Sequence, residues 1–173
     1  MKVSIGSKVL DGPWGGGNLF VKNLSLFLNS KNIEVIHDLY DKDIDIIILT
    51  DPRKSSYSST FTHEDIKNYL NFINGKALVI QRFNECDERK NTKGVNQIMI
   101  AANECSDKNI FVSQWLQDLY EEQGLPNKEN QTIMTGADNN IFNNHNSKIW
   151  DSESPLKIVT HHWGTNANKG FRD

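Results

Sequence analysis

The sequence has 173 residues, of which 37% are hydrophobic and 24% are charged, a composition that supports one folded domain and argues against a disordered chain. The net charge of -3 excludes a general attraction to nucleic acid, so an anionic ligand needs a local binding site. Two isolated cysteines, Cys86 and Cys105, belong to no CxxC pair, which argues against a disulfide framework and a structural zinc site. No apolar run has the length of a signal peptide core or a membrane span, so we expect a cytoplasmic protein.

Strand patterns and helix patterns alternate along the chain, beginning with a strand from Val3 to about Val9. Further apolar runs of strand length occur at 33–36, 43–49, 77–80, 110–112, 131–134 and 156–161. Apolar residues recur at helical spacing between them, over 19–30, 62–75, 95–103 and 113–124. The run 43–49 is apolar enough to be buried on both faces of a sheet. This order predicts an α/β fold with a doubly wound, mostly parallel, Rossmann-like sheet.

Two of the expected helices carry clear start signals. Thr62 can cap the helix that follows it, and the acidic residues Glu64 and Asp65 favour the positive end of the helix dipole. Ser113 can cap a later helix in the same way. Gly75 is expected to end the first of these two helices.

Ligands of open parallel sheets bind beyond the carboxyl ends of the strands, and a glycine-rich loop follows the first expected strand. Its candidate binding residues are Gly15, Gly16, Gly17 and Asn18. Glycines let a phosphate approach the backbone closely, and the free amides of the following helix favour an anion. The loop matches neither GxGxxG nor a Walker sequence, so a tight turn without a ligand is the alternative interpretation.

A second candidate loop runs from Gln81 to Lys93, after a buried strand. Arg82 can bind a carboxylate or phosphate through two hydrogen bonds, and Asn84 can donate to and accept from sugar hydroxyls. The charged run 87–90 in the same loop is typical of a solvated helix start.

A third candidate loop follows the last expected strand. Its adjacent histidines, His161 and His162, would point to opposite faces of a strand, so we expect no metal site there. Lys169, which precedes Gly170, suits a phosphate.

The order of these motifs resembles a family 4-type glycosyltransferase. The resemblance rests on the glycine-rich loop, on Ile110-Phe111-Val112-Ser113-Gln114-Trp115-Leu116, on Thr135-Gly136-Ala137-Asp138 with Asn140-Ile141-Phe142, and on Lys169-Gly170-Phe171. Thr135-Gly136-Ala137-Asp138 stands where the family usually has Asn-Gly-Val-Asp. The stretch 161–164 lacks the arginine that often precedes the family's Lys-Gly pair.

The resemblance implies a GT-B fold, in which two Rossmann-like domains face each other across a cleft. Residues 1–142 would form the acceptor-side domain, 143–155 the connection, and 156–173 the truncated start of the donor-binding domain. The implied reaction transfers a sugar from a nucleotide-diphosphate donor to a sugar- or lipid-linked acceptor, with retention of configuration and without a metal or other cofactor. The family's donor-binding acidic pair lies beyond Asp173, so we expect this chain alone to be inactive.

Two other functions remain open at this point. The chain could be a stand-alone α/β binding or interaction module, since folds do not fix functions. A flavodoxin-like or nucleotide-dependent oxidoreductase domain is the third reading, and the missing GxGxxG argues against it. A lipid-linked acceptor would also bring the protein into peripheral contact with a membrane, although the sequence has no basic amphipathic helix that supports such a contact.

Overall fold

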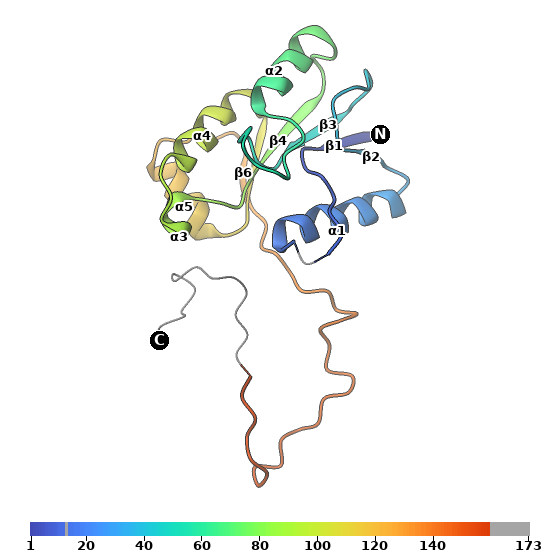
Figure 1. Ribbon diagram of the computed structural model, residues 1–173, viewed down its shortest axis with the longest axis vertical. Helices are drawn as coiled ribbons and strands as arrows, with labels where there is room; N and C mark the ends of the chain where they lie inside the picture. Colours follow the sequence, from blue (N-terminus) through green and yellow to red (C-terminus); the bar gives the residue numbers. More distant parts are fainter. Residues whose placement is uncertain (13, 160–173) are drawn as a thin grey trace.

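The computed structural model describes residues 1–12 and 14–159. Helices and strands form one body that ends at residue 132, and an extended segment leads away from it (Figure 1). The described residues contain six strands: β1 (Lys2–Ile5), β2 (Glu34–Ile36), β3 (Ile46–Leu49), β4 (Leu78–Phe83), β5 (Lys108–Phe111) and β6 (Asn130–Thr132). They form one sheet in the order β2-β1-β3-β4-β5-β6, and all neighbouring pairs are parallel. The predicted α/β, Rossmann-like fold is confirmed.

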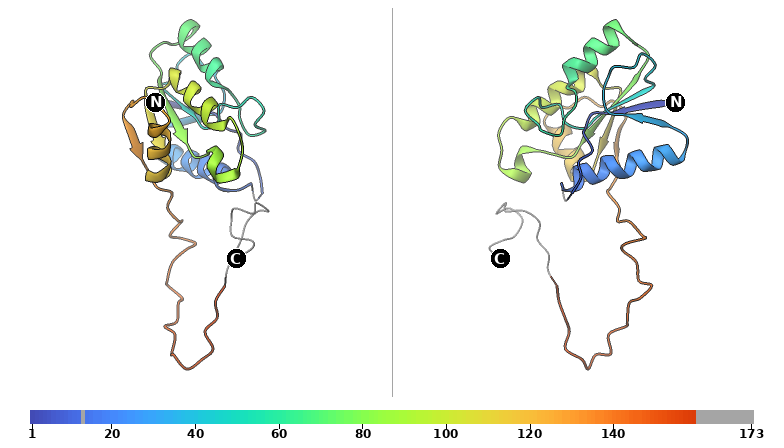
Figure 2. Two further views of the ribbon diagram at one scale, coloured as in Figure 1. Left: turned by 90° about the vertical axis from the view of Figure 1, so that its left-hand side faces the viewer. Right: turned by 45° about the vertical axis from the view of Figure 1, so that its right-hand side comes forward.

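The helices cover both faces of this sheet. They are α1 (Gly16–Ser30), α2 (His63–Phe72), α3 (Asp87–Lys90), α4 (Val95–Ala102), the short 3-10 helix η1 (Asn103–Cys105) and α5 (Gln114–Glu122). The crossover through α1 leads from β1 to β2, whereas those through α2, α4 and α5 lead the other way, from β3 to β6. Because such crossovers are right-handed, α1 lies on one face and the other long helices on the opposite face (Figure 2).

The central strand β3 is apolar on both sides for this reason. Ile47 and Leu49 are fully buried and pack in the cluster beneath α2. The alternate residues Ile46 and Ile48 pack against the cluster around Val21 of α1. Of the run 43–49 predicted to be buried on both faces, the side towards α2 is fully buried and the side towards α1 is half-buried at Ile46 and Ile48, because helices cover both faces; Asp43 and Asp45 are exposed.

Both predicted helix caps are present. The Thr62 hydroxyl accepts a hydrogen bond from the backbone N–H of Asp65, while the Asp65 carboxylate accepts one from the backbone N–H of Thr62, which completes a capping box. The Ser113 hydroxyl accepts from the backbone N–H of Leu116 at 3.2 Å. These bonds satisfy N–H groups that the first helical turn leaves without partners.

The prediction that a loop begins at Gln81 is wrong, because β4 continues to Phe83. Arg82 therefore lies in a strand, opposite Ile110 of β5. The polar sequence suggested a loop, but the fully buried Gln81 side chain donates from Nε2 to the carbonyl of Met99 at 2.8 Å. A buried polar group whose hydrogen bonds are satisfied is compatible with a central strand.

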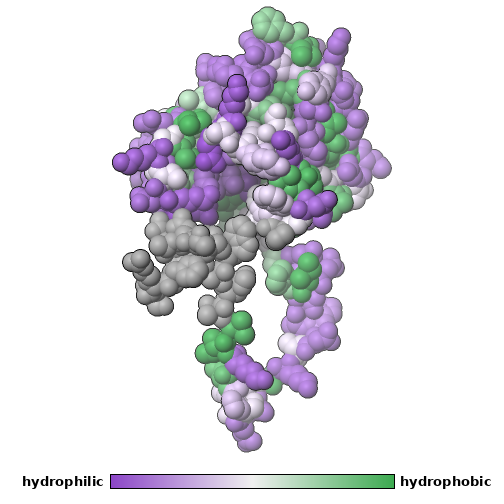
Figure 3. Space-filling model, in the orientation of Figure 1, coloured by the Kyte–Doolittle hydropathy of each residue, from purple (hydrophilic) through white to green (hydrophobic). Residues whose placement is uncertain are grey.

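Residues 133–159 contain no helix or strand, and their apolar side chains are exposed. Figure 3 shows hydrophobic side chains gathered on the lower part of this segment. The most exposed of the apolar residues in 133–159 are Ile149 and Val159. The strand predicted over 156–161 is absent from its described part, 156–159, which has no neighbouring strand to pair with. No described helix is long and apolar enough to cross a membrane.

Candidate functional site

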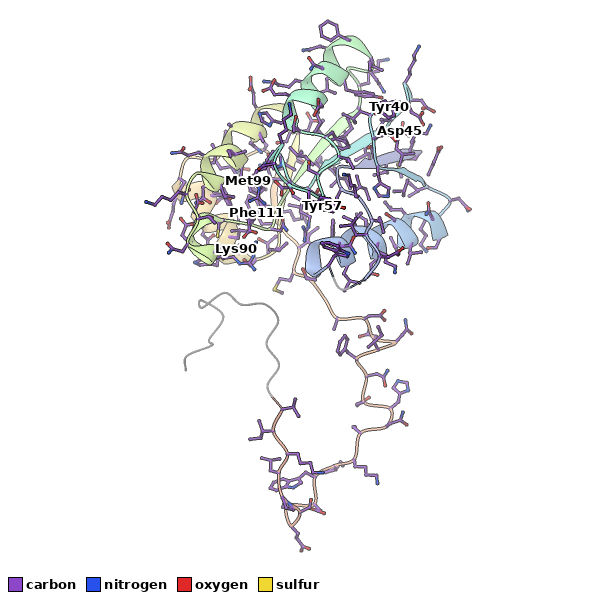
Figure 4. All side chains as sticks on the ribbon, in the orientation of Figure 1. Tyr40, Asp45, Tyr57, Lys90, Met99 and Phe111 are labelled. Carbon is purple, nitrogen blue, oxygen red and sulfur yellow. The ribbon has the colours of Figure 1, made fainter. Side chains whose placement is uncertain are left out.

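The candidate site lies where the strand order reverses. The chain moves from β1 to one side, into β2, and then crosses to the other side of β1 to form β3. Loops that leave the carboxyl ends of β1 and β3 diverge at such a switch point, which is where open α/β sheets bind ligands. A cavity of about 340 Å³ opens there between the β1–α1 loop, the β3–α2 loop and the end of β4. Tyr57 and Met99 reach it from the β3–α2 loop and from α4 (Figure 4).

Backbone contacts hold the two loops together above the sheet. Ser7 and Ser59 form an antiparallel bridge, and the N–H of Lys8 donates to the carbonyl of Ser58 at 2.8 Å. Below them, the Thr50 hydroxyl donates to the carbonyl of Gly6 at 2.9 Å. Hydrogen bonds therefore join the β1–α1 loop to the β3–α2 loop where the two loops border the cavity.

The glycine-rich segment forms the beginning of α1 at the edge of the cavity. Gly15 is the N-cap, with φ 81 and ψ -175, and it makes no side-chain cap. Gly16 and Gly17 occupy the first turn, whose amides have no partners within the helix, and this turn contains no acidic residue. An uncapped helix start with its positive dipole end at a cavity favours a bound anion.

Asn18 fixes the path of the loop that leads to this helix. Its Oδ1 accepts from the backbone N–H of Leu10 and its Nδ2 donates to the carbonyl of Leu10, both at 2.8 Å. Because the amide group is used in this pair of bonds, Asn18 positions the loop even though it lines the cavity.

Arg82 places a buried positive charge beside the cavity. Its side chain projects from the α1 face of β4 and is only 7% exposed. The guanidinium carbon lies 3.9 Å from the ring centre of Phe20 on α1. Over residues 1–12 and 14–159 it forms no ion pair and no side-chain hydrogen bond. Burial lowers the pKa of Arg82 to about 10, so the group is still a cation at neutral pH.

The acidic groups around the cavity already have partners. Asp51 accepts hydrogen bonds from Nε and Nη2 of Arg53, each at 2.8 Å. Glu85 forms an ion pair with Lys90 of α3. Neither carboxylate therefore compensates the charge of Arg82.

Two aromatic side chains stand at the rim of the cavity. The rings of Trp14 and Tyr57 stack with centres 6.0 Å apart and planes inclined by 23°. They are 55% and 69% exposed, and Trp14 Nε1 donates to the carbonyl of Asp11 at 2.7 Å, which orients the indole. The Lys8 ammonium lies 5.2 Å from the centre of the Tyr57 ring.

The structure brings several of the predicted site residues together. Gly17, Asn18, Arg82 and Asn84 line the cavity, and Gly15 and Gly16 precede them at the start of α1. Lys169, like the adjacent histidines of the third candidate loop, lies outside the described residues. The charged run 87–90 forms the short helix α3, as expected.

Sequence reasoning missed the β3–α2 loop, which supplies Asp51, Arg53 and Tyr57 to the cavity. The signal was available, since this loop follows a strong apolar strand and its residues must emerge at the same sheet edge. Trp14 belongs to the glycine-rich stretch but was not singled out there.

The two cysteines are free thiols away from the cavity lining. Burial raises the pKa of the Cys86 thiol and raises that of Cys105 to about 11. Both are therefore protonated at neutral pH and poor nucleophiles. The described residues contain no group of three or more His, Cys, Asp or Glu side chains placed to hold a metal ion.

Comparison with known proteins returns no matching family model, and no curated protein matches the chain.

Proposed function

We propose that this chain is the acceptor-side, amino-terminal half of a retaining, family 4-type glycosyltransferase. The observation that carries the proposal is the cavity at the switch point, which is lined both by the uncapped glycine start of α1 and by Arg82, a residue without an ion pair in residues 1–12 and 14–159. The ordered motifs of the sequence, from the glycine-rich loop to Lys169-Gly170, support the same class.

In this proposal the start of α1 serves the donor. The sugar leaves its nucleotide diphosphate through an oxocarbenium-like transition state, and negative charge develops on the departing diphosphate. Backbone amides at Gly16 and Gly17, aided by the helix dipole, would stabilise that charge without reorganisation. Lys169 would contribute a cation from the second wall of the cleft.

The remainder of the cavity serves the acceptor. Asn84 directly follows β4 at the cavity, and over the described residues its side-chain amide makes no hydrogen bond, which leaves it available for a sugar hydroxyl. Arg82 lies beside it. In this proposal the chain supplies only one wall of the cleft and holds the donor weakly. The chain alone should therefore have little affinity for nucleotide sugars.

The test is a sugar-transfer assay on the reading frame that contains these residues, expressed to its natural stop codon and supplied with a panel of nucleotide diphosphate sugars. Gly17→Leu should reduce transfer at least about tenfold, because a side chain there enters space now open to a ligand. Lys22→Leu, an exposed change on the same helix, is the matched control. Failure to transfer from any donor refutes the proposal, and micromolar binding of a nucleotide sugar by the 173-residue chain refutes the division of labour.

A stand-alone binding module is the second candidate, favoured by a cavity whose described lining residues all come from the body formed by residues 1–132. The discriminating result is a stop codon directly after Asp173 together with ligand binding by the chain alone.

A further inference from the structure

We propose that the acceptor taken by this cavity is an anionic sugar, a monosaccharide unit that carries a phosphate or a carboxylate. The role of this ligand as the acceptor rests on the proposed function. The binding chemistry itself rests on Arg82 and on the aromatic pair Trp14 and Tyr57.

Arg82 carries a buried charge that has no ion pair within residues 1–12 and 14–159. A buried charge is costly unless it is paired and hydrogen-bonded, and the acidic neighbours Asp51 and Glu85 are already paired with other cations. Phe20 occupies one face of the guanidinium, so the N–H groups at its edge remain available to a ligand. That planar fork binds phosphate and carboxylate through two parallel hydrogen bonds.

The aromatic pair at the rim of the cavity can bind the ring of a sugar. Trp14 and Tyr57 present stacked, half-exposed aromatic faces above a cavity that Arg82 also lines. Such faces offer apolar area to the C–H face of a sugar ring, and their rigidity limits the entropy lost on binding. The cavity volume of about 340 Å³ lies in the range of roughly 300–1,000 Å³ found for small-molecule sites, at the lower end. A single sugar with one anionic group suits this size and these two contacts.

The experiment measures binding by titration calorimetry to the 173-residue chain, with glucose 6-phosphate, glucuronate, glucose, inorganic phosphate and uridine monophosphate as probes. We expect glucose 6-phosphate or glucuronate to bind at least about tenfold more tightly than glucose or inorganic phosphate. The preferred probe identifies the anionic group as phosphate or carboxylate. The affinity of that probe should fall as salt is added, because the pairing is electrostatic. Equal binding of glucose overturns the charge argument, and tighter binding of uridine monophosphate assigns the cavity to a nucleotide instead.

Two variants separate the contributions. Arg82→Met should abolish the preference for the anionic sugar, whereas Lys76→Met, which removes an equal charge from an exposed position between α2 and β4, should leave it unchanged. Arg82→Met keeps the aliphatic stem and removes a buried charge that has no ion pair among the described residues, so its unfolding midpoint should not fall below that of the original chain. Trp14→Ala should weaken glucose 6-phosphate several-fold and leave inorganic phosphate unaffected. A folded Arg82→Met protein with the original affinities overturns the inference.

The outcomes also separate this inference from the proposed function. Sugar transfer that is insensitive to Arg82→Met overturns the anionic acceptor and leaves the glycosyltransferase proposal standing. If the protein binds the anionic sugar but transfers no sugar, the glycosyltransferase proposal is overturned and the anionic-sugar site stands.

Discussion

Gly15 and Gly16 are neighbours in the sequence, yet the fold requires glycine at only one of them. Gly15 has φ 81 and ψ -175, a conformation almost restricted to glycine, and it turns the chain into α1. A β-carbon added at Gly16 would meet no atom of the described residues within 4 Å, and its backbone is helical. The loop thus combines one glycine that shapes the backbone with others that keep space open.

We expect Gly15→Ala to lower the free energy of unfolding by about 1–3 kcal/mol, because alanine is strained in this conformation. Gly16→Ala is the matched control and should be neutral or slightly stabilising, since alanine favours a helix. Urea denaturation of both variants measures the difference. Equal stabilities would mean that the turn before α1 does not need the backbone conformation described here.

The capping box at the start of α2 should stabilise this helix. Thr62 and Asp65 exchange side-chain and backbone bonds in a capping box. We expect Thr62→Ala to cost about 1 kcal/mol of folding stability, because it exposes a first-turn N–H without a partner. Asn68→Ala, at an exposed position of the same helix, should cost nothing. Thermal unfolding followed by circular dichroism compares the two, and an equal loss would contradict the capping role.

The β3–α2 loop should make the free energy of unfolding depend on pH in the acidic range. Burial favours the neutral form of Asp51, but the hydrogen bonds from Arg53 outweigh it and hold the pKa of Asp51 below its ordinary value of 3.8. A lowered pKa in the folded state contributes stability above the unfolded pKa, and this contribution disappears as the pH falls through the folded value. Unfolding free energy should therefore decline below about pH 4.

Chemical denaturation at a series of pH values measures this decline. Asp51→Asn and Arg53→Gln should both flatten it, because each removes one partner of the same pair. If the decline keeps its slope in both variants, other carboxylates cause it and the loop does not.

At the scale of the whole molecule, the folded body ends at residue 132 and the segment 133–159 lies apart from it (Figure 1). Lysines illustrate the contrast. Lys128 donates to the carbonyls of Asn103 and Ser106 at 2.8 and 3.1 Å, whereas Lys148 and Lys157 are exposed in a stretch without regular structure. Backbone that makes few hydrogen bonds fits readily into a protease active site.

Limited trypsin digestion should therefore cut first at Lys148 and Lys157 and much later at Lys128. Mass spectrometry of the time course identifies the order of the cuts. A chain shortened to end at Gly136 should unfold at the temperature of the longer chain, because it keeps every described strand and helix. Early cleavage at Lys128, or a lower unfolding temperature of the short chain, would show that the segment supports the body.

The local sequence carried the fold class and much of the element pattern. Alternating apolar runs and helical spacing identified the parallel sheet, and the capping residues Thr62 and Ser113 marked two helix starts correctly. These features are short-range: periodicity and capping depend on residues a few positions apart. The domain boundaries at 142 and 155, the role of Lys169 and the second wall of the cleft stay predictions.

Tertiary structure alone decided where β4 ends and what surrounds Arg82. Phe20 covers its guanidinium from α1, while Asp51 and Glu85 are paired with Arg53 and Lys90, so within the described part of the chain the buried charge of Arg82 has no ion pair. The stacking of Trp14 on Tyr57 likewise joins two loops that only the strand order brings together. A sequence shows which charges exist, but the pairing of those charges depends on distances that exist only after the sheet has assembled.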